Sequence, residues 1–202
     1  MKISIPNVKD LKFLAKGKRA VVYKGFLNGI PVVVKKEKPD IKAKGRIKNE
    51  ARWLKILNKY QIGPRLYFSG KDCVVCQFIE GDTILKWISK SKKPEIEKTI
   101  IEILKQCRIL DQLGINKREL HRPLKHIIIK KRPVMIDFER TYRTKRPKNV
   151  TQFCQFIFSI SNILKEKGIK IDKEKLKKLL INYKKRMREK DFIKIISFFK
   201  KI

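Results

Sequence analysis

The spacing of apolar residues changes part-way along the chain, and this change constrains the fold more than any other feature. Up to about residue 80, short apolar runs alternate with turn residues, and Asn28-Gly29 between two such runs is a strong β-hairpin signal. From about residue 83, apolar residues recur three and four positions apart, as on one face of an α-helix. Strands followed by helices predict an α+β fold in two parts.

Individual elements follow from the same patterns. Ile47, Ala51 and Leu54 have helical spacing, and the predicted helix ends before the breaker Ile62-Gly63-Pro64. Pro94 is expected to open a long helix that ends near Gly114. Further strands are predicted over 64–70, 73–81, 126–130 and 132–138, and further helices over 83–91, 150–168 (with Asn149 as its N-cap), 176–187 and 191–202.

The charge of the chain is strongly unbalanced. There are 53 Lys and Arg residues against 19 Asp and Glu, which gives a formal net charge of +34. Such a surface attracts polyanions, including nucleic acid, nucleotide phosphates and anionic lipid. A genomic bias toward Lys is the alternative explanation, although such a bias usually raises Glu as well. We therefore expect a contact with RNA or the ribosome.

Membrane insertion and a disulfide framework are both unexpected. No run approaches the roughly 18 apolar residues of a membrane span, and the N-terminus lacks a secretory pattern, so a cytoplasmic protein without a membrane partner is predicted. The four cysteines are irregularly spaced. Cys73 and Cys76 form a C-x-x-C, but on a strand they point to opposite faces, which favours buried thiols over a metal site.

The stretch LAKGKRAVVYKG is a candidate phosphate-binding turn. It resembles the glycine-rich loop of protein kinases, in which small residues let the backbone approach the nucleotide. Gly17 matches the middle glycine and Val22 the valine of that motif, whereas Ala15 and Ala20 stand at the flanking glycine positions. Taken alone, the stretch is equally well explained as a hairpin turn.

Further motifs follow in the order found in kinases. VVVK ends with Lys35, which resembles the lysine that holds the α- and β-phosphates, and Glu50, 15 residues later, resembles its ion-pair partner. VMIDFER resembles the D-F-G signature, with Asp137 at the metal-binding position and Glu139 in place of the glycine.

Residues 11–140 together are similar to the protein-kinase-like superfamily, and in particular to an archaeal family of predicted serine/threonine protein kinases related to the small RIO-type kinases. The resemblance implies one kinase-like domain with a β-rich N-lobe (about 1–80), a hinge (about 78–82) and a reduced helical C-lobe (about 83–202). It also implies ATP and Mg²⁺ as ligands, with Phe78 and Ile79 beside the adenine.

The catalytic loop permits two alignments within KRELHRPLKHIII. In the first, HRPLK matches the kinase H-R-D-L-K, which places Pro123, a residue that cannot act as a base, 14 residues before Asp137. In the second, Glu119 takes the base position, 18 residues before Asp137, and His126 falls near the second metal-binding position. The second spacing is closer to that of kinases. However, the longer Glu side chain displaces the carboxylate, and Mg²⁺ prefers oxygen ligands to histidine.

Two functions follow. The first is an ATP-dependent atypical Ser/Thr kinase, or a related ATPase, in which Lys35, Glu119 and Asp137 act on a substrate that the sequence does not identify. The A-P-E motif that closes the usual peptide-docking segment is missing. The alternative is a pseudokinase that serves as a basic RNA- or ribosome-binding module.

Overall fold

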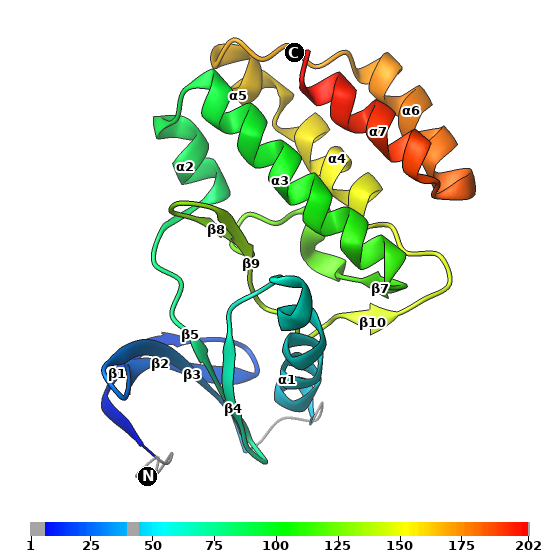
Figure 1. Cartoon of the computed structure of the whole chain (residues 1–202). Coiled ribbons are helices and arrows are strands. Elements are labelled where there is room, and N and C mark those ends of the chain that lie inside the picture. The colour runs from blue at the N-terminus through cyan, green and yellow to red at the C-terminus, as the bar shows by residue number, and fades with distance from the viewer. Residues whose placement is uncertain (1–6, 40–44, 202) are drawn as a thin grey trace. The chain divides into compact units, whose positions relative to one another are not determined.

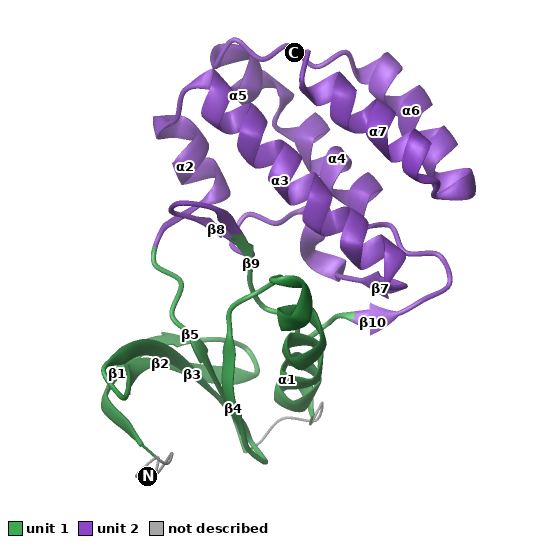
Figure 2. Ribbon diagram, viewed as in Figure 1, with its two compact units in different colours: residues 1–80, 134–141 green, residues 81–133, 142–202 purple. Residues whose placement is uncertain are grey.

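The computed structural model describes residues 7–39 and 45–201 (Figure 1). These residues form an α+β structure, which confirms the predicted class. The chain divides into two compact units: unit 1 contains residues 1–80 and 134–141, and unit 2 contains residues 81–133 and 142–202 (Figure 2). The chain therefore returns to unit 1 for eight residues (134 to 141), a return that the order of the sequence patterns did not indicate.

Unit 1 is built on a five-stranded antiparallel sheet in the order β1-β2-β3-β5-β4. Asn28 and Gly29 both have positive φ, at 49° and 79°, and Leu27 pairs with Ile30, so the predicted hairpin is confirmed. The strands are β1 (Val8–Lys16), β2 (Ala20–Leu27), β3 (Ile30–Glu37), β4 (Leu66–Ser69) and β5 (Cys73–Gln77).

Each face of this sheet has its own apolar cluster. On one face, Val74 packs with Ile47 and Ala51 of helix α1 (Arg46–Leu57), which a 3₁₀ turn, η1 (Asn58–Tyr60), follows. The other face buries Cys73 among valines of β3 and β5. All four cysteines are free and buried; burial was predicted for Cys73 and Cys76.

Unit 2 is a helical bundle with four short strands and a 3₁₀ turn. Helix α3 begins with Pro94 in its first turn and packs against α4 and α7, while α6 packs against α7. The helices are α2 (Ile84–Lys90), α3 (Lys93–Gln112), α4 (Asn149–Ser159), α5 (Ser161–Glu166), α6 (Lys173–Arg186) and α7 (Glu189–Phe199). Among the described residues, no helix has both the length and the apolar character needed to cross a membrane.

Unit 2 also contains short paired strands. Strand β6 (Asp82–Thr83) pairs with β8 (Ile127–Ile129), and β7 (Ile115–Asn116) pairs with β10 (Tyr142–Arg143). The 3₁₀ turn η2 (Arg118–His121) follows β7, and β9 (Pro133–Met135) leads the chain back into unit 1.

Two helix predictions were wrong in detail. Asn149 is not the N-cap of α4 but its first residue, and Lys148 occupies the cap position. The helix predicted over 150–168 is divided into α4 and α5 because Ile160 departs from helical geometry, with φ −104° and ψ 14°. The Asn149 side chain is fully buried and bonds inward, which prevents it from capping the helix.

Candidate functional site

The centre of unit 1 is an ion pair between Lys35 on β3 and Glu50 on α1. Lys35 Nζ lies 2.7 Å from Oε1 and 2.9 Å from Oε2 of Glu50. The Glu50 side chain is only 1% exposed. A carboxylate buried to this extent needs a charged partner to offset the loss of hydration, and Lys35 is that partner.

Asp137 brings a second carboxylate to the same lysine. Its Oδ1 lies 3.6 Å from Lys35 Nζ, and about a third of its side chain (34%) is exposed. Its backbone φ is 64°, a left-handed conformation that is uncommon for residues other than glycine and is concentrated at functional sites. Asp137 therefore presents a solvent-accessible carboxylate beside a cation whose other partner is buried.

The residue after Asp137 contacts the ion pair as well. The backbone amide of Phe138 donates to Glu50 Oε1 at 3.4 Å, and the Phe138 ring is fully buried. A side chain added at Gly63 would come within 2.9 Å of that ring. Packing of Phe138 thus fixes the backbone that carries Asp137.

Nearby negative charge and burial have opposite effects on the pKa of Lys35. Burial by itself would lower the pKa of Lys35, but the negative charges of Glu50 and Asp137 outweigh it, so the pKa is raised above its ordinary value. The neighbouring thiol behaves differently, because burial, reinforced by Glu50, raises the pKa of Cys76 to about 12. At neutral pH the site therefore contains a charged ammonium and a neutral thiol.

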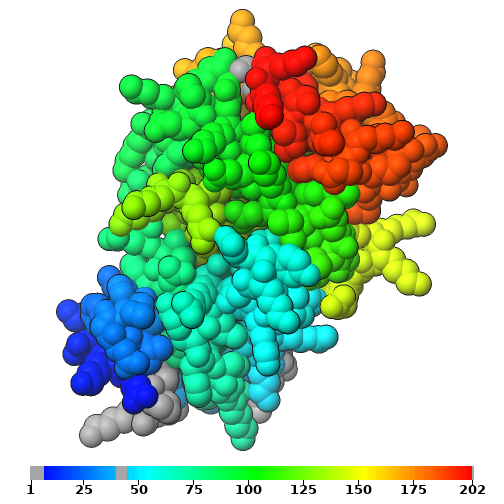
Figure 3. Space-filling view, viewed as in Figure 1, coloured from blue at the N-terminus to red at the C-terminus, as the bar shows by residue number. Residues whose placement is uncertain are grey.

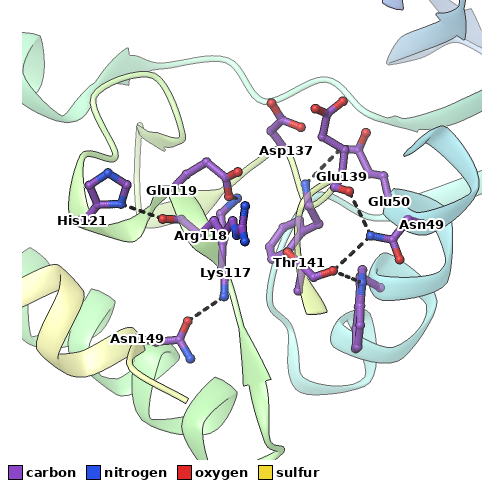
Figure 4. A network of polar contacts seen from close by, with 12 residues as sticks. Asn49, Glu50, Lys117, Arg118, Glu119, His121, Asp137, Glu139, Thr141 and Asn149 are labelled. Atoms are coloured by element: carbon purple, nitrogen blue, oxygen red, sulfur yellow. Dashed lines mark hydrogen bonds and ion pairs between the residues drawn. The ribbon is translucent and has the colours of Figure 1, made fainter. Parts of the chain in front are cut away.

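Helix α1 also anchors the segment that follows Asp137 (Figure 4). Asn49 Nδ2 donates to the backbone oxygens of Glu139 at 2.9 Å and Thr141 at 3.0 Å. Trp53 Nε1 donates to the same Thr141 oxygen at 2.9 Å. One helix thus positions Glu50 and holds the backbone on the C-terminal side of Asp137. Asn49 and Trp53 were not singled out in the sequence, since nothing local indicates their distant partners.

The Glu139 side chain ties this segment to the β1–β2 turn. Its Oε1 accepts a hydrogen bond from Arg19 Nη1 at 2.9 Å. The sequence pattern placed Glu139 where the kinase signature has glycine, and in this structure the residue serves as an ion-pair partner of the turn.

The small residues predicted to cover a ligand lie in and beside that turn. Ala15 pairs with Val22 across β1 and β2, and the Gly17 amide donates to the Ala20 oxygen at 2.9 Å. Lys38 Nζ donates to the Gly17 oxygen at 2.6 Å. A Cβ at Gly17 would meet only the Ala20 oxygen, at 3.4 Å. The fold alone therefore leaves room for a side chain at position 17.

The remaining residues of unit 1 that were predicted to bind a ligand are Val22 on β2 and Phe78 and Ile79, which follow β5. Val22 is the cross-strand partner of Lys35, so both side chains lie on the same face of the sheet. The Phe78 amide donates to the Pro31 oxygen at 3.1 Å, and Lys24 Nζ lies 4.3 Å above the Phe78 ring. Phe78 and Ile79 are both half-buried.

In unit 2, Glu119 is held by a lysine that the sequence analysis did not single out. Lys117 has no exposed surface, and its Nζ lies 3.2 Å from Glu119 Oε2. Glu119 itself is 9% exposed. Because Lys117 immediately precedes the 3₁₀ turn that contains Glu119, a local contact orients this carboxylate.

The other residues of this loop have different environments. His121 is exposed, with Nδ1 2.8 Å from the Arg118 oxygen. Pro123 is buried, and its carbonyl oxygen accepts from the amide of His126 at 2.9 Å, which forms a turn. His126 is half-buried.

A buried polar network stabilises the loop that carries Lys117 and Glu119. Asn149 Oδ1 accepts from the Lys117 amide at 2.9 Å, and Asn149 Nδ2 donates to the Ile115 oxygen and to Asp111 Oδ1 at 2.6 and 2.7 Å. Asp111 also accepts from Tyr183 Oη at 2.8 Å. Burial raises the pKa of Asp111, while the hydrogen bonds from Asn149 and Tyr183 oppose that rise.

The described residues contain no group of three or more His, Cys, Asp or Glu side chains arranged to hold a metal ion. This arrangement is compatible with Mg²⁺ bound through a nucleotide, because Mg²⁺ commonly takes one or two protein carboxylates and completes its shell with phosphate oxygens and water. Asp137, accessible and next to Lys35, is the carboxylate in unit 1 best suited to that role.

Comparison with known proteins adds a relationship but no activity. No family model matches the chain. A protein of Methanocaldococcus jannaschii, "Uncharacterized protein MJ1211", is 30% identical over 89 residues, which cover 44% of this chain and 77% of that protein. The chain belongs to the same family as this protein. The name of the relative states no substrate or ligand.

Proposed function

We propose that the chain is an atypical phosphotransferase of the protein-kinase-like superfamily, which uses Mg-ATP to phosphorylate a Ser or Thr hydroxyl. In this proposal unit 1 is a β-rich N-lobe and unit 2 a reduced helical C-lobe. The observation that carries the proposal is the Lys35 ammonium, bonded to Glu50 and 3.6 Å from Asp137. An archaeal relative is consistent with the family that the motifs resemble.

The three charged groups suit phosphoryl transfer because that reaction depends on positioning and charge stabilisation. Lys35 is fixed by Glu50 and keeps a raised pKa, so it would hold the phosphates as a permanent cation. Asp137 would hold Mg²⁺, which neutralises phosphate charge when bound. The tight β1–β2 turn, with its small residues at 15, 17 and 20, would cover the phosphates.

Glu119 is the proposed residue that orients the acceptor hydroxyl and accepts its proton. Its ion pair with the buried Lys117 restrains the carboxylate, which offsets part of the freedom that an extra methylene introduces. Pro123, the residue at the base position in the other alignment, has no side-chain group that can accept a proton.

A pseudokinase is the second candidate function. It is favoured by the net charge of +34 and by the replacement of both an aspartate and an asparagine in the catalytic loop, at Glu119 and His126. In that case the chain would serve as a basic RNA- or ribosome-binding module and would transfer no phosphate, whether or not it binds nucleotide.

The decisive experiment measures binding of Mg-ATP and transfer of its γ-phosphate by the full chain. We expect wild type to bind and transfer, and Lys35→Met and Asp137→Asn to lose transfer by about 10²-fold or more. Lys36→Met is the matched control, because Lys36 is adjacent on β3 and, among the residues that the structure describes, its side chain pairs only with the exposed Asp72, at 3.8 Å. A wild-type protein that binds no ATP with Mg²⁺ or Mn²⁺ would refute the proposal.

A further inference from the structure

The segment formed by β10 and the residues that lead to α4 combines dense positive charge with high exposure. Arg143, Lys145, Arg146 and Lys148 are all exposed, and residues 142–148 contain no acidic residue. We call residues 142–148 the basic segment. In the part of the chain that the structure describes, these four side chains form no ion pair or hydrogen bond. The segment, yellow in Figures 1 and 3, projects from the helices of its unit.

The backbone of the basic segment is nevertheless firmly held. Thr144 donates to the Gly114 oxygen at 2.8 Å, and the Lys148 amide donates to Asn116 Oδ1 at 2.8 Å. Pro147 is buried. The fold therefore fixes the main chain and leaves four cations without intramolecular neutralisation. A ligand that pairs with these cations would order little additional backbone, which lowers the entropic cost of binding.

An exposed aromatic ring stands at the start of the segment. Tyr142 is 42% exposed, and the guanidinium of Arg118 lies 5.7 Å from the centre of its ring. Tyr142 belongs to β10, where it pairs with Asn116, so its backbone position is set by the sheet. A flat ring beside cations is the combination on which bases of a single strand stack while their phosphates are neutralised.

We propose that the basic segment and Arg118 form a docking site for single-stranded RNA. Phosphates would contact the four segment cations, and one base would stack on Tyr142 next to Arg118. RNA fits better than duplex DNA, because its recognised regions are mostly single-stranded with splayed bases, and the segment offers no helix for a groove. A lipid surface fits less well, because the segment lacks the apolar side chains that enter a bilayer.

This inference does not depend on phosphate transfer, because none of its residues is assigned a role in ATP binding or in accepting the proton of the substrate hydroxyl. The test is fluorescence anisotropy of a labelled, unstructured RNA with the full chain at several salt concentrations. For wild type we expect binding that weakens as salt rises. Arg143→Gln/Lys145→Gln/Arg146→Gln/Lys148→Gln should bind at least about tenfold more weakly, with the slope of log K against log salt shallower by about 3, at roughly 0.7 per lost phosphate contact.

The control removes the same charge elsewhere on unit 2. Lys175, Lys178, Lys184 and Lys185 are exposed on α6, and their change to Gln lowers the net charge by the same four units. We expect this variant to retain most of the affinity and slope. Equal losses in the two variants would overturn the proposal, because binding would then reflect only total charge.

Stacking is tested at Tyr142 alone. Tyr142→Phe should retain affinity and Tyr142→Ala should lose about fivefold or more, because stacking of one base contributes roughly 1 kcal/mol or more. Equal affinity of the two variants contradicts the base-stacking role. Preferential binding of the basic segment to anionic vesicles or to polyglutamate, with no measurable RNA binding, would overturn the assignment of RNA as the partner.

Discussion

The ammonium of Lys35 lies 3.6 Å from the Asp137 carboxylate while both of its hydrogen bonds go to Glu50. One cation therefore forms ion pairs with a buried carboxylate and with an accessible one. Loss of Lys35 would leave Glu50 buried without its charge partner, which bears on stability, whereas at Asp137 it would affect the ligand binding that we propose.

The stability of unit 1 should depend strongly on this pair. Lys35→Met leaves the Glu50 charge buried without its main partner, so we expect the free energy of unfolding to fall by about 3–5 kcal/mol. Lys35→Met/Glu50→Leu removes both charges and should recover most of that loss. Urea unfolding of wild type, both single variants and the double variant measures the coupling. Additive losses would show that the pair does not stabilise the unit.

The proposed role of Glu119 can be separated from nucleotide binding, but Glu119→Gln also removes the charge partner of the buried Lys117 and is expected to lower the free energy of unfolding. Glu119→Gln retains the shape of the side chain but cannot accept a proton, so we expect phosphate transfer to fall by about 10²-fold or more, with ATP affinity within about twofold of wild type. His121→Gln is the control, because His121 is exposed on the same 3₁₀ turn. Unchanged transfer in Glu119→Gln would exclude this residue as the base.

Asp111 should be a stability determinant of unit 2. Its carboxylate accepts from the amides of Asn149 and Val150, from Asn149 Nδ2 and from Tyr183 Oη. Asp111→Asn would turn one acceptor oxygen into a donor that faces other donors. We expect it to lower the free energy of unfolding by about 2–4 kcal/mol, whereas Tyr183→Phe, which removes one hydroxyl, should cost about 1 kcal/mol.

The same substitution should reveal the direction of the Asp111 pKa shift. Because the pKa is raised above its ordinary 3.8, the folded state binds the proton more tightly than the unfolded chain does. The contribution of protonated Asp111 to the free energy of unfolding is fully present below the unfolded-state pKa of 3.8. It is lost as the pH rises through the higher pKa of the folded state. The deficit of Asp111→Asn relative to wild type should therefore shrink from acidic to neutral pH. A deficit that grows with pH would indicate a lowered pKa.

The cysteines should be unreactive in the folded protein. All four are buried, and burial raises the pKa of the Cys76 thiol to about 12. Since the thiolate is the reactive form, a thiol reagent at pH 8 should label none of the four rapidly, and all four after denaturation. Rapid labelling of Cys73 and Cys76 with release of zinc would instead indicate a metal site.

Local sequence determined the elements of this protein. Asn28-Gly29 specified the hairpin because both positions need positive φ, which these residues adopt readily. The apolar spacing within α1 and α3 specified those helices because one face of each had to be buried. The pairing of Lys35 with Glu50 was expected from the resemblance of these two positions to the ion pair of kinases, and the two side chains are hydrogen-bonded.

Only the tertiary structure decided which polar groups those elements bury together. A local pattern made Asn149 a helix cap, but its side chain instead joins Asp111, Ile115 and the Lys117 amide. Nothing near Asn49 in the sequence indicates its bonds to Glu139 and Thr141. The spacing of apolar residues predicts which residues face the interior, but it does not predict which acceptor a buried hydrogen-bond donor will contact. That acceptor can come from any part of the chain. The tertiary structure determines these donor–acceptor pairs, and in this protein they hold the chain next to both Asp137 and Glu119.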